Sequence, residues 1–85
     1  MEEMVGKNVV VDVVSQFVYL GRLQEVGQKT VVLKNADVHD LRDSTTTREV
    51  YVRDARLHGI QPNRNRVHVR LEQIVSVSLL DDVIQ

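Results

Sequence analysis

The chain has 85 residues, which is enough for one small domain but too few to divide between two hydrophobic cores. It contains no cysteine, which excludes disulfide bonds, thiolate zinc sites and cysteine nucleophiles. A net charge of −1 argues against a protein that coats nucleic acid through bulk electrostatic attraction.

The first half of the sequence predicts three strands joined by short turns. Residues 8–14 are dominated by valine and alternate between two faces, as in a strand. Residues 17–26 form a second predicted strand, in which Gly21 indicates a sharp bend or a close backbone approach. After a turn at 27–28, a third strand begins over 30–33 and can extend to 38. Such short connections are typical of an antiparallel meander.

The middle of the chain predicts a loop and then one short helix. Residues 39–47 are polar and lack periodicity, as in a loop. Thr46 stands before Glu49 at the spacing of a capping box, and Gly59 lies where a helix commonly ends. We therefore expect an inserted helix at about 47–58. The alternative is a strand over 49–53, because Val-Tyr-Val favours β-structure.

The last third of the sequence predicts two more strands. Residues 61–65 include the single proline of the chain and indicate a turn. Apolar and polar residues then alternate over 67–72 and again over 74–79, the period of half-buried strands. Five strands with one helical insertion predict a mainly β protein, a small and strongly bent antiparallel barrel.

Two blocks of sequence resemble a known family. Gly6-Lys7-Asn8-Val9-Val10-Val11, Gly21-Arg22-Leu23 and Val31-Val32-Leu33-Lys34-Asn35-Ala36 together resemble the first Sm motif. The run Val67-His68-Val69-Arg70-Leu71-Glu72-Gln73-Ile74-Val75-Ser76-Val77-Ser78-Leu79 resembles the second. The chain is thus similar to the Sm-like (LSm) family, as one domain over 1–85 with motif blocks at about 6–38 and 66–80 and an insertion at about 39–65.

The resemblance implies a five-stranded SH3-type barrel that pairs its edge strands with those of other copies to form a homo-oligomeric ring. It also implies RNA binding in pockets near the pore, built from the turn between the second and third strands and from the arginine after the fourth. Carried onto this sequence, the RNA-binding residues are Lys29, Thr30 and Arg70. An arginine can stack on bases and donate two hydrogen bonds to phosphate, although Arg70 could instead pair with Glu72.

The positions that bind the ligand in the Sm motifs differ in this sequence from the family pattern. Residues 27–30 contain no asparagine and no aromatic ring, Leu71 replaces a glycine, and Glu72 stands in an Asp or Asn position. A second hypothesis is therefore a homo-oligomeric protein-interaction module without a base pocket, whose insertion at 42–60 presents Tyr51, Arg53 and Arg56 to a partner protein. A third is another SH3-like family, such as the PRC barrels, which also open with a Gly-Lys-x-Val strand.

The remaining charged and polar residues give no strong indication of a binding or catalytic site. Six arginines lie between Arg48 and Arg70 against Glu49 and Asp54, a local excess typical of solvated surface. The residues Asp37, His39 and Asp40 could in principle ligate a metal, but polar residues entering a loop seldom do. No nucleophile, phosphate-loop or dinucleotide signature is present.

From these patterns we expect a protein that is not an enzyme and that uses no cofactor or metal. Its longest apolar stretch is too short to span a bilayer, and the N-terminal residues are acidic where a signal peptide would be basic. We therefore expect a cytoplasmic protein without a membrane partner.

Overall fold

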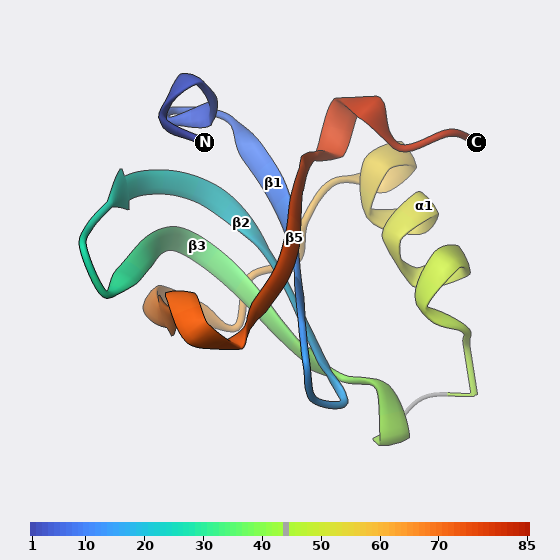
Figure 1. Ribbon diagram of the computed structural model, residues 1–85. Coiled ribbons are helices and arrows are strands. Elements are labelled where there is room, and N and C mark those ends of the chain that lie inside the picture. The colour runs from blue at the N-terminus through green and yellow to red at the C-terminus, as the bar shows by residue number, and fades with distance from the viewer. Residues whose placement is uncertain (44) are drawn as a thin grey trace.

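The fold is described from a computed structural model, which describes residues 1–43 and 45–85. The strands and helix in this part of the chain are β1 (Asn8–Val13), β2 (Phe17–Val26), β3 (Thr30–Asp40), α1 (Arg48–His58), β4 (Arg64–Arg70) and β5 (Ile74–Leu79). Short 3-10 turns are η1 (Glu2–Met4), η2 (Leu41–Asp43), η3 (Leu71–Gln73) and η4 (Leu80–Asp82) (Figure 1). This arrangement confirms the predicted mainly β, five-stranded fold with one inserted helix. Among the helices described here, none is long and apolar enough to cross a bilayer.

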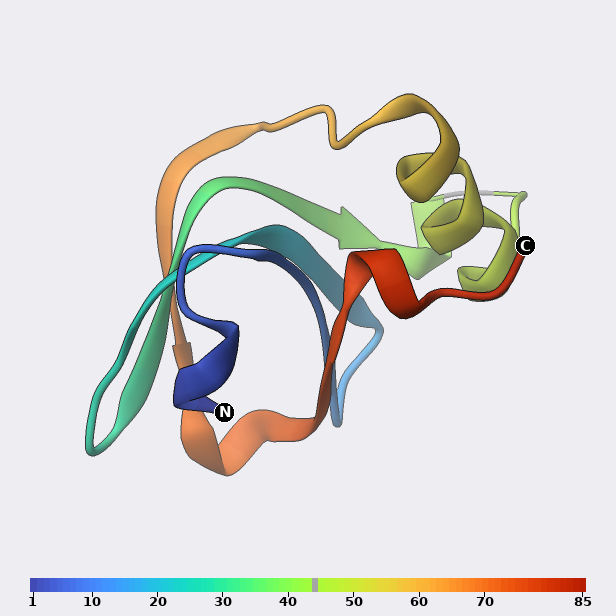
Figure 2. The ribbon, with the colours of Figure 1, turned by 90° about the horizontal axis from the view of Figure 1, so that it is seen from above.

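The strands form a single antiparallel sheet in the order β4-β3-β2-β1-β5. Figure 2 shows the sheet curving around a common interior, with η3 carrying the chain from β4 to β5. The two strands that follow the insertion therefore lie at opposite edges of the sheet. Within the described residues, β4 pairs only with β3, and β5 pairs only with β1.

The sheet bends where β2 passes β3. The register of β2 against β3 shifts between Leu20 and Arg22 and again between Leu23 and Glu25, and such bulges sharpen the local twist. A Cβ atom on Gly21 would lie 3.2 Å from the Cα of Ala36. A side chain here would require the neighbouring backbone to shift by a few tenths of an ångström, which confirms the close approach predicted at this position.

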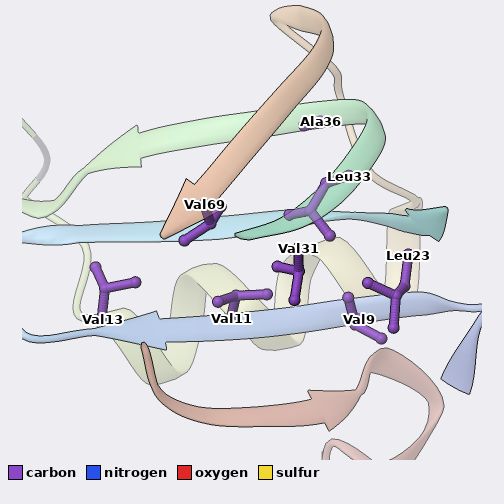
Figure 3. Packing of buried hydrophobic residues seen from close by; sticks show 8 residues of the cluster. All are labelled: Val9, Val11, Val13, Leu23, Val31, Leu33, Ala36 and Val69. Carbon is purple, nitrogen blue, oxygen red and sulfur yellow. The ribbon is translucent and has the colours of Figure 1, made fainter. Parts of the chain in front are cut away.

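The interior of the barrel is lined by side chains from alternate strand positions. Val9 and Val11 of β1 face Val31 and Leu33 of β3 across the core, and all four are fully buried. Figure 3 shows these side chains pointing into one space together with those of Val13, Leu23, Ala36 and Val69. The two-residue period of the sequence thus accounts directly for the buried face.

A second apolar cluster lies on the outside of the sheet. Val10, Val18 and Leu20 point away from the barrel interior and pack against the helix residues Val52 and Ala55, and Leu80 of η4 completes the cluster. Figure 1 shows α1 beside η4, close to the C-terminus. The inserted helix therefore covers part of the outer face of β1 and β2.

Polar contacts hold the helix in this position. The guanidinium of Arg48 lies 3.3 Å from one carboxylate oxygen of Asp12 on β1. The other oxygen of Asp12 accepts a hydrogen bond from the Ser76 hydroxyl of β5 at 3.1 Å. At the other end of α1, the Nε of Arg56 donates to the backbone carbonyl of Asp81 at 3.2 Å. Both ends of the helix are thus tied to the sheet or to η4.

The helix boundaries correct one detail of the sequence prediction. The N-cap is Thr47 rather than Thr46, since the Thr47 hydroxyl accepts a hydrogen bond from the Val50 backbone N–H at 3.3 Å. The helix ends before Gly59, as predicted, and the Gly59 N–H donates to the Ala55 carbonyl at 2.8 Å. Gly59 has a φ of 91°, a conformation that favours glycine.

Some strand limits also differ from the prediction. β1 ends at Val13 rather than at 14, and β4 begins at Arg64, inside the predicted turn at 61–65. β3 continues to Asp40, so the predicted loop at 39–47 begins with strand. The extension of β3 depends on tertiary structure, because Phe17 of β2 pairs with Asp40. This pairing gives a backbone partner to polar residues that have little β propensity. Residue 44 of the predicted loop lies outside the described residues.

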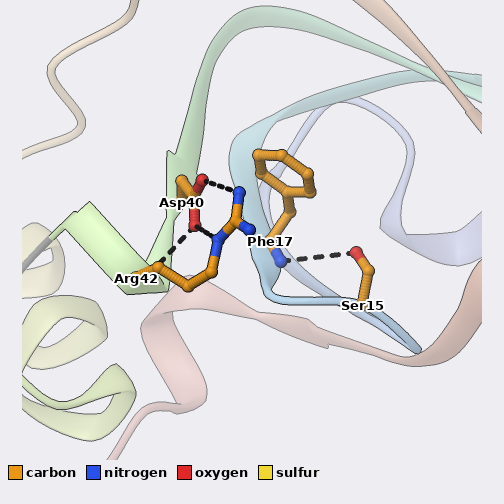
Figure 4. A network of polar contacts seen from close by, with 4 residues as sticks. All are labelled: Ser15, Phe17, Asp40 and Arg42. Atoms are coloured by element: carbon orange, nitrogen blue, oxygen red, sulfur yellow. Dashed lines mark hydrogen bonds and ion pairs between the residues drawn. The ribbon is translucent and has the colours of Figure 1, made fainter.

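The corner where the insertion leaves the sheet is fixed by local hydrogen bonds (Figure 4). The Arg42 guanidinium donates to both carboxylate oxygens of Asp40, at 3.1 and 2.9 Å, and these bonds hold the pKa of Asp40 below its usual range. The Phe17 N–H donates to the Ser15 hydroxyl at 3.4 Å. Asp40 therefore pairs with Arg42, and Phe17 is held by the adjacent turn.

Candidate nucleic-acid interface

The structure brings together the residues that the sequence resemblance singled out. Lys29 and Thr30 lie at the turn from β2 to β3, and Arg70 is the last residue of β4. Thr30 and Arg70 are directly opposite each other across β3 and β4. The Leu71 N–H donates to the Lys29 carbonyl at 2.8 Å. Two connections that are far apart in sequence thus lie side by side.

These connections border a shallow cleft of about 410 Å³, lined by Gln28, Lys29, Arg70, Leu71 and Glu72. The Nε of Arg70 lies 3.0 Å from a Glu72 carboxylate oxygen, and the two side chains are 73% and 64% exposed. This is the ion pair that the sequence offered as the alternative role of Arg70. An exposed pair of this kind contributes about 0–1 kcal/mol, so a phosphate or carboxylate of a ligand can replace Glu72 at little cost.

The chemistry of the cleft is cationic and polar. Lys29 supplies an ammonium group, Arg70 a planar guanidinium and Gln28 an amide, while Leu71 contributes an apolar surface. None of the residues that line it carries an aromatic ring. The cleft can therefore hold a phosphate and hydrogen-bond a base or ribose, but stacking depends on the guanidinium plane. Gln28 is the lining residue that the sequence did not single out, because turn amides carry no signal.

A second polar cluster joins the inserted helix to β3. Asp37 is a buried acid, 7% exposed, and one carboxylate oxygen accepts a hydrogen bond from the Tyr51 hydroxyl. The other accepts from the Asn63 side-chain amide at 3.2 Å. Burial raises the pKa of the Asp37 carboxyl, and the nearby His39 partly opposes this rise. Asp37 thus acts as an acceptor that connects three segments of the chain.

The candidate metal ligands Asp37, His39 and Asp40 all make contacts with other side chains of the chain. The ring of His39 stacks on that of Tyr51, with centroids 3.8 Å apart and an interplanar angle of 11°, while Asp40 binds Arg42. Asp37 and His39 share one face of β3, as the strand period predicts, but both contact Tyr51. Across residues 1–43 and 45–85, no group of three His, Cys, Asp or Glu side chains is arranged to hold a metal ion. The sequence missed Tyr51 and Asn63 as partners because neither has a distinctive spacing from Asp37.

A cleft of about 410 Å³ lies next to this cluster, bordered by Asp37 and Tyr51 together with His58 and Gln61. Its walls come from β3, from α1 and from the segment that leads into β4. The hydroxyl of Tyr51 is already bonded to Asp37. The Tyr51 and Asp37 side chains at this cleft are therefore used to hold the helix against β3.

Comparison with solved structures identifies the architecture. An Sm protein from Pyrococcus abyssii, solved in complex with a uridine heptamer, is similar to this chain with a TM-score of 0.62. The similarity covers 92% of this chain and 89% of the other, at 18% sequence identity. The chain has the Sm-like fold. No protein-family model matches the sequence, and no curated protein matches it significantly.

The Sm-like fold confirms the architecture that the two motif blocks predicted. It also explains the position of the insertion, since α1 is added outside the barrel without interrupting β3 or β4. Lys29, Thr30 and Arg70 therefore lie next to one another where the β2–β3 turn meets the end of β4 in an Sm-like barrel.

Proposed function

We propose that this protein forms a homo-oligomeric ring that binds RNA weakly through Lys29, Thr30 and Arg70. The observation that carries the proposal is the hydrogen bond from Leu71 to Lys29, which places a turn lysine and a strand-end arginine in one exposed cleft. Ammonium and guanidinium groups bind phosphate, and guanidinium also stacks on bases. The similarity to an Sm protein solved in complex with a uridine heptamer supports RNA as the ligand.

The sheet edges support assembly into a ring. Within the described residues, β4 and β5 each leave one backbone edge unpaired, and such edges are templates for pairing with another chain. Val75 on β5 is 65% exposed, which adds an apolar side chain to this edge. Pairing β4 of one copy with β5 of the next is a head-to-tail contact, and a ring closes it. A small domain without disulfides also gains stability from such contacts.

The assembly state tests the ring. We expect native mass spectrometry and sedimentation to give one closed oligomer over a wide concentration range. Val75→Lys should shift it toward smaller species, because it places a charge where the next copy would pack. Val14→Lys, at an equally exposed valine in the β1–β2 turn, is the matched control. A wild-type protein that stays monomeric would contradict the ring.

Fluorescence anisotropy with short U-rich and A-rich oligomers at low salt tests RNA binding. Arg70→Gln should weaken binding about tenfold or more, because a hydrogen bond to a charged group contributes ~1.5–3 kcal/mol. Glu72→Gln should strengthen it, since it frees the guanidinium from its ion pair. Arg53→Gln on the exposed face of α1 is the control. If the wild-type protein binds neither oligomer at low salt, where electrostatic contacts are strongest, the RNA proposal is wrong.

A second candidate function is that of a ring-forming protein-interaction module without a base pocket. It is favoured by the exposed side chains of Val50 and Leu57 on α1, which are 40% and 56% exposed and lie on one helix face with Arg53. Tyr51 and Arg56, which the sequence also predicted to face a partner, contact Asp37 and Asp81 of their own chain.

This second function makes a separate prediction. The double variant Val50→Ser with Leu57→Ser leaves the buried helix residues Val52 and Ala55 in place, so α1 should keep its fold. A partner that co-purifies stoichiometrically with the wild-type ring should be lost from the variant, while binding of RNA oligomers stays unchanged. If the double variant retains the partner, the helix face is not the binding surface.

A further inference from the structure

We propose that a row of cations on the outer face of the sheet, formed by Arg22, Lys34 and Arg66, binds the sugar-phosphate backbone of single-stranded RNA. This row is separate from the Lys29–Arg70 cleft, and its assignment to RNA rests on the proposed function. Arg22 of β2 is directly opposite Lys34 of β3, which is in turn directly opposite Arg66 of β4. Residues opposite each other on neighbouring strands project from the same face of a sheet.

The neighbouring residues identify this face as the outer one. Leu23 is opposite Leu33, and both are fully buried in the barrel interior. Side chains alternate along a strand, so Arg22 and Lys34 point outward, and both are exposed. On β2 the same outward face continues from Leu20, which packs against α1. The inserted helix thus covers one end of this face and leaves the cationic end open.

Within the described residues, none of the three side chains forms an ion pair with an acid. Like charges directly opposite each other on neighbouring strands destabilise a sheet. In residues 1–43 and 45–85, neither Arg22, Lys34 nor Arg66 lies in an ion pair, whereas other exposed arginines do, Arg42 and Arg70 among them. The sheet therefore tolerates a repulsion that a bound anion would relieve. Strands are about 4.8 Å apart, so the row is roughly 10 Å long, which suits a chain of phosphates better than a single anion.

Amide side chains and a cleft lie beside the row of cations. Asn8 of β1 is directly opposite Arg22, which adds an amide to the same line. A cleft of about 400 Å³ is bordered by Arg22, Lys34 and Asn35 together with Gly6. Asn35 has a φ of 50° at the place where the β2–β3 register shifts. The end of the row is therefore a hollow with amide donors, rather than a flat charged surface.

The row connects to the proposed RNA site along β4. Arg66, His68 and Arg70 occupy alternate positions of this strand and are all exposed. Their partners on β3 are Lys34, Val32 and Thr30. One acid, Glu25, lies opposite Val32 on this face. An RNA chain held at Arg70 can thus continue past His68 onto the row, and this continuity favours RNA over an acidic protein as the ligand.

The test compares oligomers of two lengths. The variant Arg22→Gln/Lys34→Gln/Arg66→Gln is titrated by fluorescence anisotropy with U-rich RNA of about 6 and about 24 nucleotides over a range of salt. The longer RNA should lose at least tenfold in affinity. The slope of log K against log salt should also become shallower by about 2, since each phosphate contact with a single strand contributes about 0.7. Binding of the shorter RNA should change little.

The controls separate this inference from the proposed function. The variant Arg42→Gln/Arg53→Gln/Arg56→Gln has the same change in net charge away from the row, and circular dichroism and thermal melting check the fold of both variants. If the row variant leaves the affinity and salt slope of the long RNA unchanged while Arg70→Gln weakens both RNAs, the inference is wrong and the proposed function stands. If the wild-type protein binds neither RNA, both are wrong. If poly-glutamate binds the wild-type protein as tightly as RNA does, and the row variant weakens that binding as well, the assignment of the row to RNA is wrong.

Discussion

Tyr51 of the inserted helix donates a hydrogen bond from its hydroxyl to Asp37 of β3, and its ring stacks on His39 of the same strand. One helix residue therefore makes both a polar and an aromatic contact with the third strand. Together with the apolar contacts of Val52 and Ala55, these interactions make the insertion part of the folded domain.

Removing the Tyr51 hydroxyl should destabilise the fold. Tyr51→Phe keeps the ring on His39 but deprives the buried Asp37 carboxylate of a donor, which should lower the free energy of unfolding by ~1–3 kcal/mol. Urea denaturation measures the change. Tyr19→Phe is the matched control, since the Tyr19 ring packs near Phe17 and its substitution should have little effect. Equal midpoints for wild type and Tyr51→Phe would contradict the role of the hydroxyl.

The buried Asp37 should give the fold a distinct dependence on pH. Its pKa is raised in the folded state because burial disfavours the charged form. Its contribution to stability is therefore fully present below the unfolded pKa, about 3.9, and is lost as the pH rises through the folded pKa. Asp40 acts in the opposite sense, because hydrogen bonds from Arg42 lower its pKa.

The variant Asp37→Asn isolates this effect. Relative to the wild type, it should gain stability as the pH rises from about 4 toward neutrality, because the wild type alone must then bury a charge. The contribution of Asp40 is common to both proteins and cancels in the difference. Urea denaturation at a series of pH values provides the measurement. A difference in unfolding free energy that stays constant with pH would show that Asp37 does not titrate in this range.

A side chain at Gly21 should destabilise the fold, because the neighbouring strand would have to shift. A Cβ atom there would lie 3.2 Å from the Cα and 3.3 Å from the Cβ of Ala36, so Gly21→Ala should force β2 and β3 apart. We expect a loss of ~1–3 kcal/mol in the free energy of unfolding, measured by chemical denaturation. Gln24→Ala, at an exposed position of the same strand, should change it by no more than about 0.5 kcal/mol. A neutral Gly21→Ala would mean that the strands can separate without cost.

The helix cap offers a test of the corrected boundary. Thr47→Ala removes the oxygen that accepts from the Val50 N–H and should lower stability by ~1 kcal/mol. Thermal unfolding monitored by circular dichroism measures the loss. Thr45→Ala, outside the helix and exposed, serves as the control. A larger effect at Thr45 than at Thr47 would place the start of the helix elsewhere.

Much of the candidate site could be expected from the sequence through its resemblance to the Sm motifs. Lys29 and Thr30 belong to a turn and Arg70 ends a strand, and the order of the motif blocks predicted that these segments meet. Their function in binding stays a prediction. The row of Arg22, Lys34 and Arg66 could not be predicted in this way, because its members come from three strands whose pairing is offset by two register shifts. Asn63 was missed for a similar reason, since it reaches Asp37 from the residue before β4, and the pairing of β4 with β3 brings the two together.

The sequence by itself determined the buried faces, the bend at Gly21 and the helix that ends before Gly59, because alternation, helical period and the freedom of glycine are properties of adjacent residues. Only the tertiary structure decided that β3 extends to Asp40, that Tyr51 turns inward to Asp37, and that three cations line up across the sheet. Each of these depends on which distant backbone or side chain supplies the partner. Strand register and helix docking settle that choice, and both are collective results of packing the whole chain.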